Sequence, residues 1–272
     1  MRDTSFWPRS FLEEVERLEL RRGIVLWSLG SPSFLYKSPQ ATIYIDPYFG
    51  PTPPEAATLY PGVYRTTAVP IYPAEISRVD AVIATHEHTD HCYEPTLLAF
   101  QSHTNAQFFA SEIAAQRMLR GGIESARVKT IQPGDELIIN DVQIRVFTSH
   151  DPDAPGAVTF LFMAEGITLF VSGDTRNGPT LERIGNEYEV DIALLAFGSS
   201  RWYMTYDQML PAARRLKPKV LLPFHWEVWR KETGDILALG KNLALNPPPF
   251  EVRLLHIGDH IRYEADRGIV RD

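Results

Sequence analysis

Residues 83–92 read IATHEHTDHC, a stretch in which four potential metal ligands lie close together: His86, His88, Asp90 and His91. Imidazole nitrogen and carboxylate oxygen are ligands that borderline divalent ions such as Zn²⁺ accept, whereas closed structural zinc sites usually use cysteine. The chain has one cysteine, Cys92, which excludes a cage of thiolates. The stretch therefore predicts a metal site built from histidine and carboxylate.

The stretch follows residues 79–84, VDAVIA, a short apolar segment typical of a buried strand. We therefore expect the ligands at the point where a strand ends and a loop begins. His86 and His88 would share one face if the strand continued, whereas the adjacent Asp90 and His91 would point apart. This spacing indicates a tight turn and favours two metal positions.

The composition of the chain limits its class. Its 272 residues are 44% hydrophobic and 11% aromatic, which is enough to bury a large core. A net charge of -7 gives no basic footprint for nucleic acid or for an anionic membrane, and no run approaches the roughly 20 apolar residues of a membrane span. The single cysteine excludes an intrachain disulfide and favours the cytoplasm. We expect a small-molecule substrate, and the composition is compatible with a homo-oligomer.

The order of the predicted elements indicates a single domain over residues 1–272, because no segment has the composition of a linker. It begins with an amphipathic helix at about residues 5–22 and a hairpin of strands 24–29 and 42–46. A proline-rich loop at about residues 50–73 is typical of a lid or binding loop. Successive strands follow over residues 136–171, then helices and strands in alternation, and a closing hairpin over residues 253–263.

Three more polar residues follow apolar strands in the same way as the opening stretch. His150 follows the predicted strand 142–147, Asp174 follows 169–171, and His225 follows 220–222. If these strands run in the same sense, their ends meet at one rim. The other histidines His103, His256 and His260 lack this context, and we expect them in surface or structural roles.

The ordered set HxHxDH, His, Asp, His resembles that of the metallo-β-lactamase-fold hydrolase superfamily. The resemblance implies an α+β fold, a four-layer αβ/βα sandwich of two mixed β-sheets flanked by helices. It also implies that His86, His88 and His150 hold a first metal and that Asp90, His91 and His225 hold a second. Asp174 would bridge the two ions, which are expected to be Zn²⁺ or Mn²⁺, with Fe²⁺ also compatible.

Within that superfamily the chain is most similar to the L-ascorbate 6-phosphate lactonase family. The similarity is carried by short stretches at residues 27–30, 73–76, 79–81, 185–187, 191–194, 204–205 and 223–229. The chain departs from the lactonase pattern around His150, and it is shorter over residues 151–158 and at its C-terminal end. The lactonases are associated with Mn²⁺.

The expected function is that of a metal-dependent hydrolase, which attacks a lactone or cyclic ester, such as a sugar-phosphate lactone, with a metal-bound hydroxide at a dinuclear site. Asp90 is the expected catalytic carboxylate, and Arg65, Arg176 and Arg201 are candidates for binding a substrate phosphate. One alternative is a phosphodiesterase for a small phosphodiester. A second is a metal-stabilised binding protein without enzymatic activity.

Overall fold

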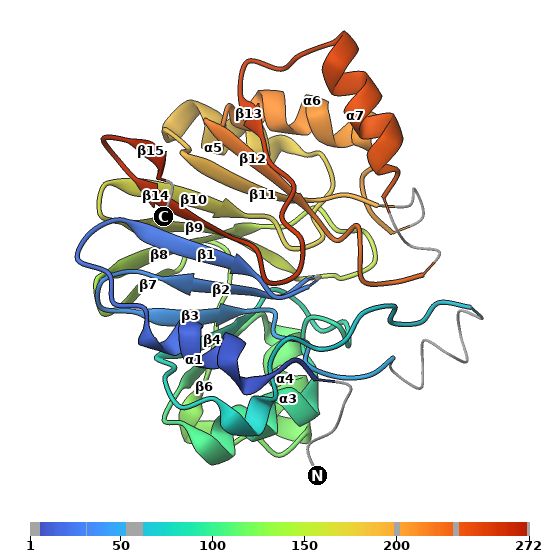
Figure 1. The fold of residues 1–272 in the computed structure, drawn as a ribbon. Coiled ribbons are helices and arrows are strands. Elements are labelled where there is room, and N and C mark those ends of the chain that lie inside the picture. The colour runs from blue at the N-terminus through green and yellow to red at the C-terminus, as the bar shows by residue number, and fades with distance from the viewer. Residues whose placement is uncertain (1–5, 31, 53–61, 199–201, 231–233, 271–272) are drawn as a thin grey trace.

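Two β-sheets packed face to face form the centre of the protein (Figure 1). The computed structural model describes residues 6–30, 32–52, 62–198, 202–230 and 234–270. In the first sheet the strand order is β15 (Gly268–Val270), β14 (His260–Glu264), β1 (Ile24–Ser28), β2 (Phe34–Lys37), β3 (Thr42–Ile45), β4 (Ala81–Ala84), β5 (Gln107–Ala110), β6 (Val128–Thr130). In the second it is β13 (Glu251–Val252), β12 (Val220–Phe224), β11 (Ile192–Ala196), β10 (Ile167–Val171), β9 (Val158–Ala164), β8 (Val142–Thr148), β7 (Glu136–Ile139).

The central strands are buried on both faces, so their sequences are apolar at almost every position. In β1, Ile24 and Leu26 belong to the cluster between the two sheets. Val25 and Trp27 point the other way and pack in the cluster under the helices of the first sheet. This alternation follows from the two-residue period of a strand and supplies both faces of the sheet with core.

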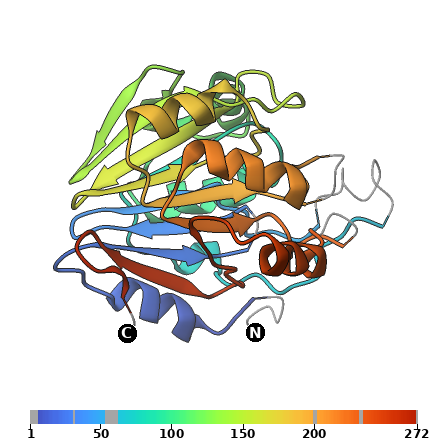
Figure 2. The ribbon, with the colours of Figure 1, turned by 90° about the horizontal axis from the view of Figure 1, so that it is seen from above.

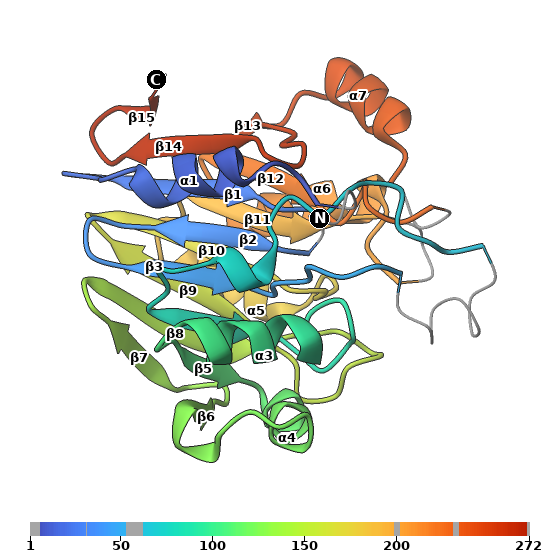
Figure 3. The same cartoon turned by 60° about the horizontal axis from the view of Figure 1, so that its bottom comes forward.

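Helices cover the outer face of each sheet. Helices α1 (Arg9–Arg17), α3 (Glu94–His103) and α4 (Glu112–Arg120) cover the first sheet, and Figure 3 shows α1 and α3 lying across it. Helices α5 (Pro179–Glu187), α6 (Tyr206–Leu216) and α7 (Ile236–Leu245) cover the second, as Figure 2 shows from above. Two short 3-10 helices, η1 (Pro73–Glu75) and η2 (Ser125–Arg127), lie in the first half of the chain. The predicted four-layer α+β sandwich is confirmed.

The strand directions bring the predicted ligands to one edge. Strands β3, β4, β5 and β6 are parallel to one another, and so are β10, β11, β12 and β13. Strand β9 is antiparallel to both β8 and β10, so β8 runs in the same direction as β10. The segments that follow β4, β8, β10 and β12 therefore emerge at carboxyl ends, where ligand sites of such sheets usually lie.

Two predicted hairpins were wrong. Strand β2 lies between β1 and β3 and pairs with both. It includes a buried lysine, Lys37, whose ammonium donates to the carbonyls of Val15 and Leu18. Because a charged residue interrupts the apolar pattern, the sequence does not indicate that this strand is fully buried. At the C-terminal end β13 joins the second sheet instead of pairing with β14, and the hairpin is β14 with β15.

The N-terminal helix and the proline-rich loop differ from expectation in extent. Helix α1 spans Arg9–Arg17 within the predicted range of about 5–22, and residue 5 lies outside the described ranges. The Lys37 ammonium binds the carbonyls of Val15 and Leu18 where the helix ends. Residues 53–61 of the loop also lie outside them, whereas residues 62–72 run without helix or strand and form an isolated bridge between Arg65 and Trp229. No helix in the described ranges has the length and apolar character needed to cross a membrane.

Candidate metal centre

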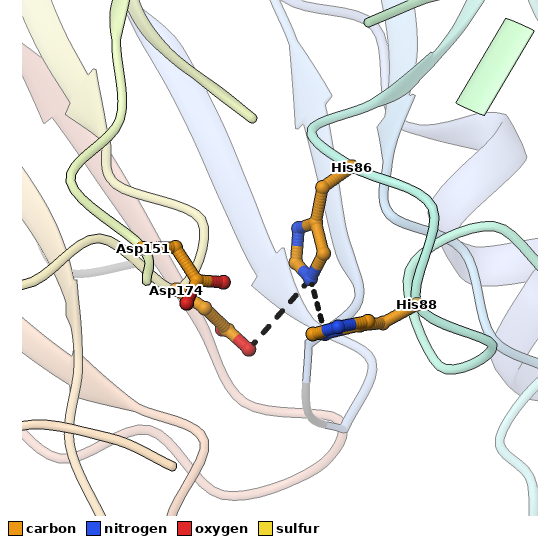
Figure 4. A group of neighbouring side chains, drawn as sticks. All are labelled: His86, His88, Asp151 and Asp174. Carbon is orange, nitrogen blue, oxygen red and sulfur yellow. Dashed lines mark hydrogen bonds and ion pairs between the residues drawn. The ribbon is translucent and has the colours of Figure 1, made fainter. Parts of the chain in front are cut away.

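One group of potential ligands comprises His86, His88, Asp151 and Asp174 (Figure 4), with one ligand atom from each lying within 4.8 Å of the others. His86 Nε2 is 3.0 Å from His88 Nδ1 and 3.8 Å from an oxygen of Asp174. His86 is fully buried, and burial and His91 lower its pKa well below the usual value. His86 is therefore a neutral imidazole, the form that binds a metal.

A second group comprises Asp90, His91 and His225, again with ligand atoms within 4.8 Å of one another. The Nε2 atoms of His91 and His225 are 3.4 Å apart, and His225 Nε2 is 3.4 Å from Asp90 Oδ2. His225 has a φ of 71°, a left-handed conformation that costs energy in a non-glycine residue. This turn directly after β12 brings the imidazole to the other two side chains.

Asp174 lies between the two groups. Its Oδ2 is 3.3 Å from His91 Nε2 and 3.8 Å from His86 Nε2, and its Oδ1 is 3.7 Å from His225 Nε2. Burial raises the pKa of Asp174, but His91 and His225 outweigh this effect and hold the pKa well below its usual range. A buried carboxylate that keeps its charge needs a cation nearby.

The polar atoms of the centre fit divalent cations. Among the described residues, Asp151 Oδ2 and Asp174 Oδ1 are buried without a hydrogen-bond partner. Burial lowers the pKa of His91, but Asp174 and Asp46 raise it well above the usual value, so the carboxylates favour positive charge at this point. Unpaired carboxylate oxygens beside imidazole nitrogens are the donor set that divalent metals accept.

Asp46 supports the second group, and the sequence analysis did not find it. It follows β3 with a φ of 46° and is 2% exposed. Its carboxylate accepts hydrogen bonds from the backbone N–H and the hydroxyl of Thr85, and it lies 2.8 Å from His91 Nδ1. A proton held on Nδ1 leaves Nε2 of His91 facing Asp174 and the other ligands. The rule of a polar residue after an apolar strand applies to Asp46 as well, but the predicted strand 42–46 includes this residue, whereas β3 ends at Ile45.

Replacing Asp46 by alanine should weaken metal binding at the second group about 10- to 100-fold, because His91 loses the partner that fixes its orientation. Calorimetric titration of the metal-free protein with Zn²⁺ measures this change. The matched control is Asp80→Ala, which removes a carboxylate that accepts from the Thr42 backbone at the opposite end of β3. Equal affinities of the two variants would show that Asp46 does not position His91.

His150, predicted as a ligand, lies outside both groups, and the adjacent Asp151 lies in the first. The Nε2 atom of His150 is 2.9 Å from Thr180 Oγ1 and accepts from the Thr180 backbone N–H at 3.4 Å. Since Thr180 is in the first turn of α5, the imidazole caps this helix. Of the adjacent pair 150 and 151, only Asp151 therefore offers a ligand atom to the centre.

Replacing His150 by alanine should therefore lower the free energy of unfolding of the metal-free protein by about 1 kcal/mol, as the loss of a helix cap usually does. Urea denaturation followed by circular dichroism measures the difference. His103→Ala, which removes an exposed imidazole from the last turn of α3, serves as the control. A His150→Ala protein as stable as this control would contradict the capping role.

The predicted substrate-binding arginines have different surroundings. Arg65 Nε donates to the carbonyl of Thr67, its guanidinium lies 5.8 Å from the ring centroid of Tyr48, and burial lowers its pKa to about 10. Arg176 Nη1 donates to the carbonyl of Tyr203, whose ring lies 4.1 Å from that of His225. Arg201 lies outside the described residues. Arg176 is thus connected to the centre through Tyr203.

Comparison with known proteins places this centre in a family. Residues 25–225 match the family model described as the beta-lactamase superfamily domain. The chain belongs to this family. The match begins at β1 and ends at His225, so it includes every member of both ligand groups. The predicted relationship to the metallo-β-lactamase fold is confirmed.

Among curated proteins, the chain is 28% identical over 196 residues to the "Probable L-ascorbate-6-phosphate lactonase UlaG" of Salmonella heidelberg strain SL476. The alignment covers 63% of this chain and 55% of the relative, so the chain spans about half the length of the curated relatives it matches. The predicted similarity to the lactonase family is confirmed.

Two solved structures share the fold at low sequence identity. Igni18, a metallo hydrolase from Ignicoccus hospitalis, matches with a TM-score of 0.68 and 19% identity, over 89% of this chain and 98% of its own. The isothiocyanate hydrolase from Delia radicum gut bacteria matches with a TM-score of 0.74 and 15% identity, over 89% of this chain and 99% of its own.

Proposed function

We propose that this chain hydrolyses a lactone or another cyclic ester, such as a sugar-phosphate lactone, with two divalent ions held by the two ligand groups. The observation that carries the proposal is the position of Asp174, which lies 3.8 Å from His86 of one group and 3.3 Å from His91 of the other. A single carboxylate within reach of both groups is the arrangement that a dinuclear centre requires. The similarity to a lactonase over 196 residues supports the substrate class.

Divalent ions bound in this centre would lower the pKa of a bound water molecule to about 7 and so supply a nucleophile at neutral pH. His86, His88 and Asp174 would hold one ion, and Asp90, His91 and His225 the other. Zn²⁺ and Mn²⁺ both suit these ligands, and Fe²⁺ does as well. We place the enzyme in the cytoplasm, since one cysteine provides no intrachain disulfide.

Asp90 is the residue that we propose as the catalytic carboxylate. Its side chain is 18% exposed, compared with 7% for Asp174, so water and substrate have more access to it. Burial raises the pKa of Asp90, but His91 and His225 outweigh this effect and keep the group anionic at neutral pH. An anionic carboxylate at this position would orient the attacking water and accept its proton as the ester oxygen leaves.

Arg65 and Arg176 are the residues that we propose to contact an anionic substituent of the substrate, together with Arg201. The support is strongest for Arg65, because its Nη1 and Nη2 atoms are buried without a hydrogen-bond partner in the described ranges. A guanidinium with two unused donor groups matches the oxygens of a phosphate. This match favours a phosphorylated molecule as the proposed substrate.

The proposal is tested with protein loaded with Zn²⁺ or Mn²⁺ and two sets of small substrates. One set contains lactones with and without a phosphate group, and the other contains simple phosphodiesters. We expect turnover of lactones, with a lower KM for the phosphorylated ones. Turnover of phosphodiesters alone would replace the proposal with a phosphodiesterase, and no turnover of either set by metal-loaded protein would favour a binding protein.

A further inference from the structure

The fourth member of the first ligand group is a carboxylate, Asp151. Its Oδ1 accepts a hydrogen bond from the backbone N–H of Asp153 at 2.9 Å, which fixes the orientation of the side chain. The other oxygen, Oδ2, is buried and has no hydrogen-bond partner among the described residues. Figure 4 shows this carboxylate beside Asp174, on the side that faces His86 and His88. One oxygen is therefore held by the loop, and the other is left for an ion.

His150 is held away from the centre by contacts on three sides. Its backbone N–H donates to Thr175 Oγ1 at 2.7 Å, and its carbonyl accepts from the Arg176 N–H at 3.3 Å. Its imidazole caps α5 through Thr180 and packs on Gly178, where an added Cβ would lie 2.2 Å from His150 Cδ2. Turning the imidazole towards His86 would break the cap and leave a gap over Gly178.

We propose that Asp151, and not His150, completes the first metal position, which is then a site of two histidines and two carboxylates. This inference rests on the proposed dinuclear function. Relative to a site with a third histidine, the added carboxylate replaces a borderline nitrogen ligand with a hard oxygen ligand. The first position should therefore prefer Mn²⁺ or Fe²⁺ over Zn²⁺ more strongly than a three-histidine position would.

The extra carboxylate also changes the charge of the loaded centre. Asp90, Asp151 and Asp174 together carry three negative charges against the four positive charges of two divalent ions. With a histidine ligand in place of Asp151 the balance would be one unit more positive. A centre with a lower positive charge attracts an anionic substrate less strongly. Residues outside the ligand groups would then contribute a larger share of the free energy of substrate binding.

The test measures metal binding and does not depend on activity. Wild type, Asp151→Ala, His150→Ala and Asp153→Ala are stripped with a chelator and titrated with Mn²⁺ by calorimetry, and bound metal is counted after gel filtration. We expect two equivalents in wild type, His150→Ala and the control Asp153→Ala. In Asp151→Ala the affinity of one equivalent should fall at least about 100-fold. Loss of an equivalent in His150→Ala, or unchanged binding in Asp151→Ala, would overturn the assignment.

Two further variants keep the test decisive if the alanine protein does not fold. Asp151→Asn preserves the shape of the side chain and should lower Mn²⁺ affinity at one site by at least about tenfold. Asp151→His should raise the ratio of Zn²⁺ to Mn²⁺ affinity at that site by at least about tenfold. Unchanged Mn²⁺ affinity in the first, or an unchanged ratio in the second, contradicts the inference.

The lactone assay on wild-type protein separates this inference from the proposed function. Absence of lactone turnover in protein that holds two ions, one of them dependent on Asp151, rejects the proposed lactonase activity and leaves the ligand assignment standing. A wild-type protein that binds no divalent ion overturns both.

Discussion

Replacing Asp90 by asparagine is expected to lower kcat for lactone hydrolysis by about 10²- to 10⁴-fold, the range typical of losing a general acid–base group. The amide keeps the size of the side chain but cannot accept a proton from the attacking water. It also removes the negative charge that lies 3.4 Å from His225 Nε2. The measurement is steady-state kinetics on whichever lactone the wild type turns over best, with the metal content of each preparation determined in parallel.

Glu87→Gln is the matched control for this substitution. Glu87 lies in the same loop as Asp90, and the variant makes the same exchange of carboxylate for amide, but the residue belongs to neither ligand group. It should keep the kcat of the wild type. If the Asp90→Asn enzyme holds two ions and retains the wild-type kcat, Asp90 is not the catalytic carboxylate.

Removing the metal ions should abolish hydrolysis and lower the Tm by about 10 °C. The stability part follows from binding linkage, because two ions, each present at about 30 times its Kd, together stabilise the folded chain by about 4 kcal/mol, and 1 kcal/mol corresponds to about 2–4 °C in a protein of this size. In the metal-free centre the carboxylates of Asp90 and Asp174 also lose their cations. Differential scanning calorimetry before and after dialysis against a chelator measures the shift.

Two variants control the calorimetric experiment. His103→Ala should show the full decrease in Tm on chelation, since this imidazole is exposed and belongs to neither ligand group. His88→Ala should show a smaller decrease, because one ligand group is already incomplete. A wild-type Tm that does not respond to the chelator or to added Zn²⁺ and Mn²⁺ would contradict a metal-stabilised centre.

Much of the fold and of the centre is predictable from the sequence because two simple rules apply. Buried strands such as β4 and β11 read as short apolar runs, and their bounds follow from the residues that interrupt them. The polar residues after parallel strands meet at one edge, which places Asp174 3.8 Å from His86 and 3.7 Å from His225. The element order then leaves few architectures that bury both faces of each sheet.

The sequence does not predict the ligand set where it depends on the direction in which one side chain points. His150 and Asp151 are adjacent potential ligands after β8, and the pattern of residues does not say which of them faces the centre. The choice depends on Thr180 and Gly178 of a distant helix terminus, which hold the imidazole. Asp46 and His225 both adopt positive φ values, a conformation that propensities do not predict for these residues in advance.

The most direct test of the central claim is a crystal structure of the protein purified with its own metal, with anomalous scattering recorded at the metal absorption edges. The account predicts two anomalous peaks, one among His86, His88 and Asp174 and one among Asp90, His91 and His225, each about 2.0–2.3 Å from its ligand atoms. A carboxylate oxygen of Asp174 should reach both ions. A single peak, or two peaks that Asp174 does not join, would contradict the dinuclear centre.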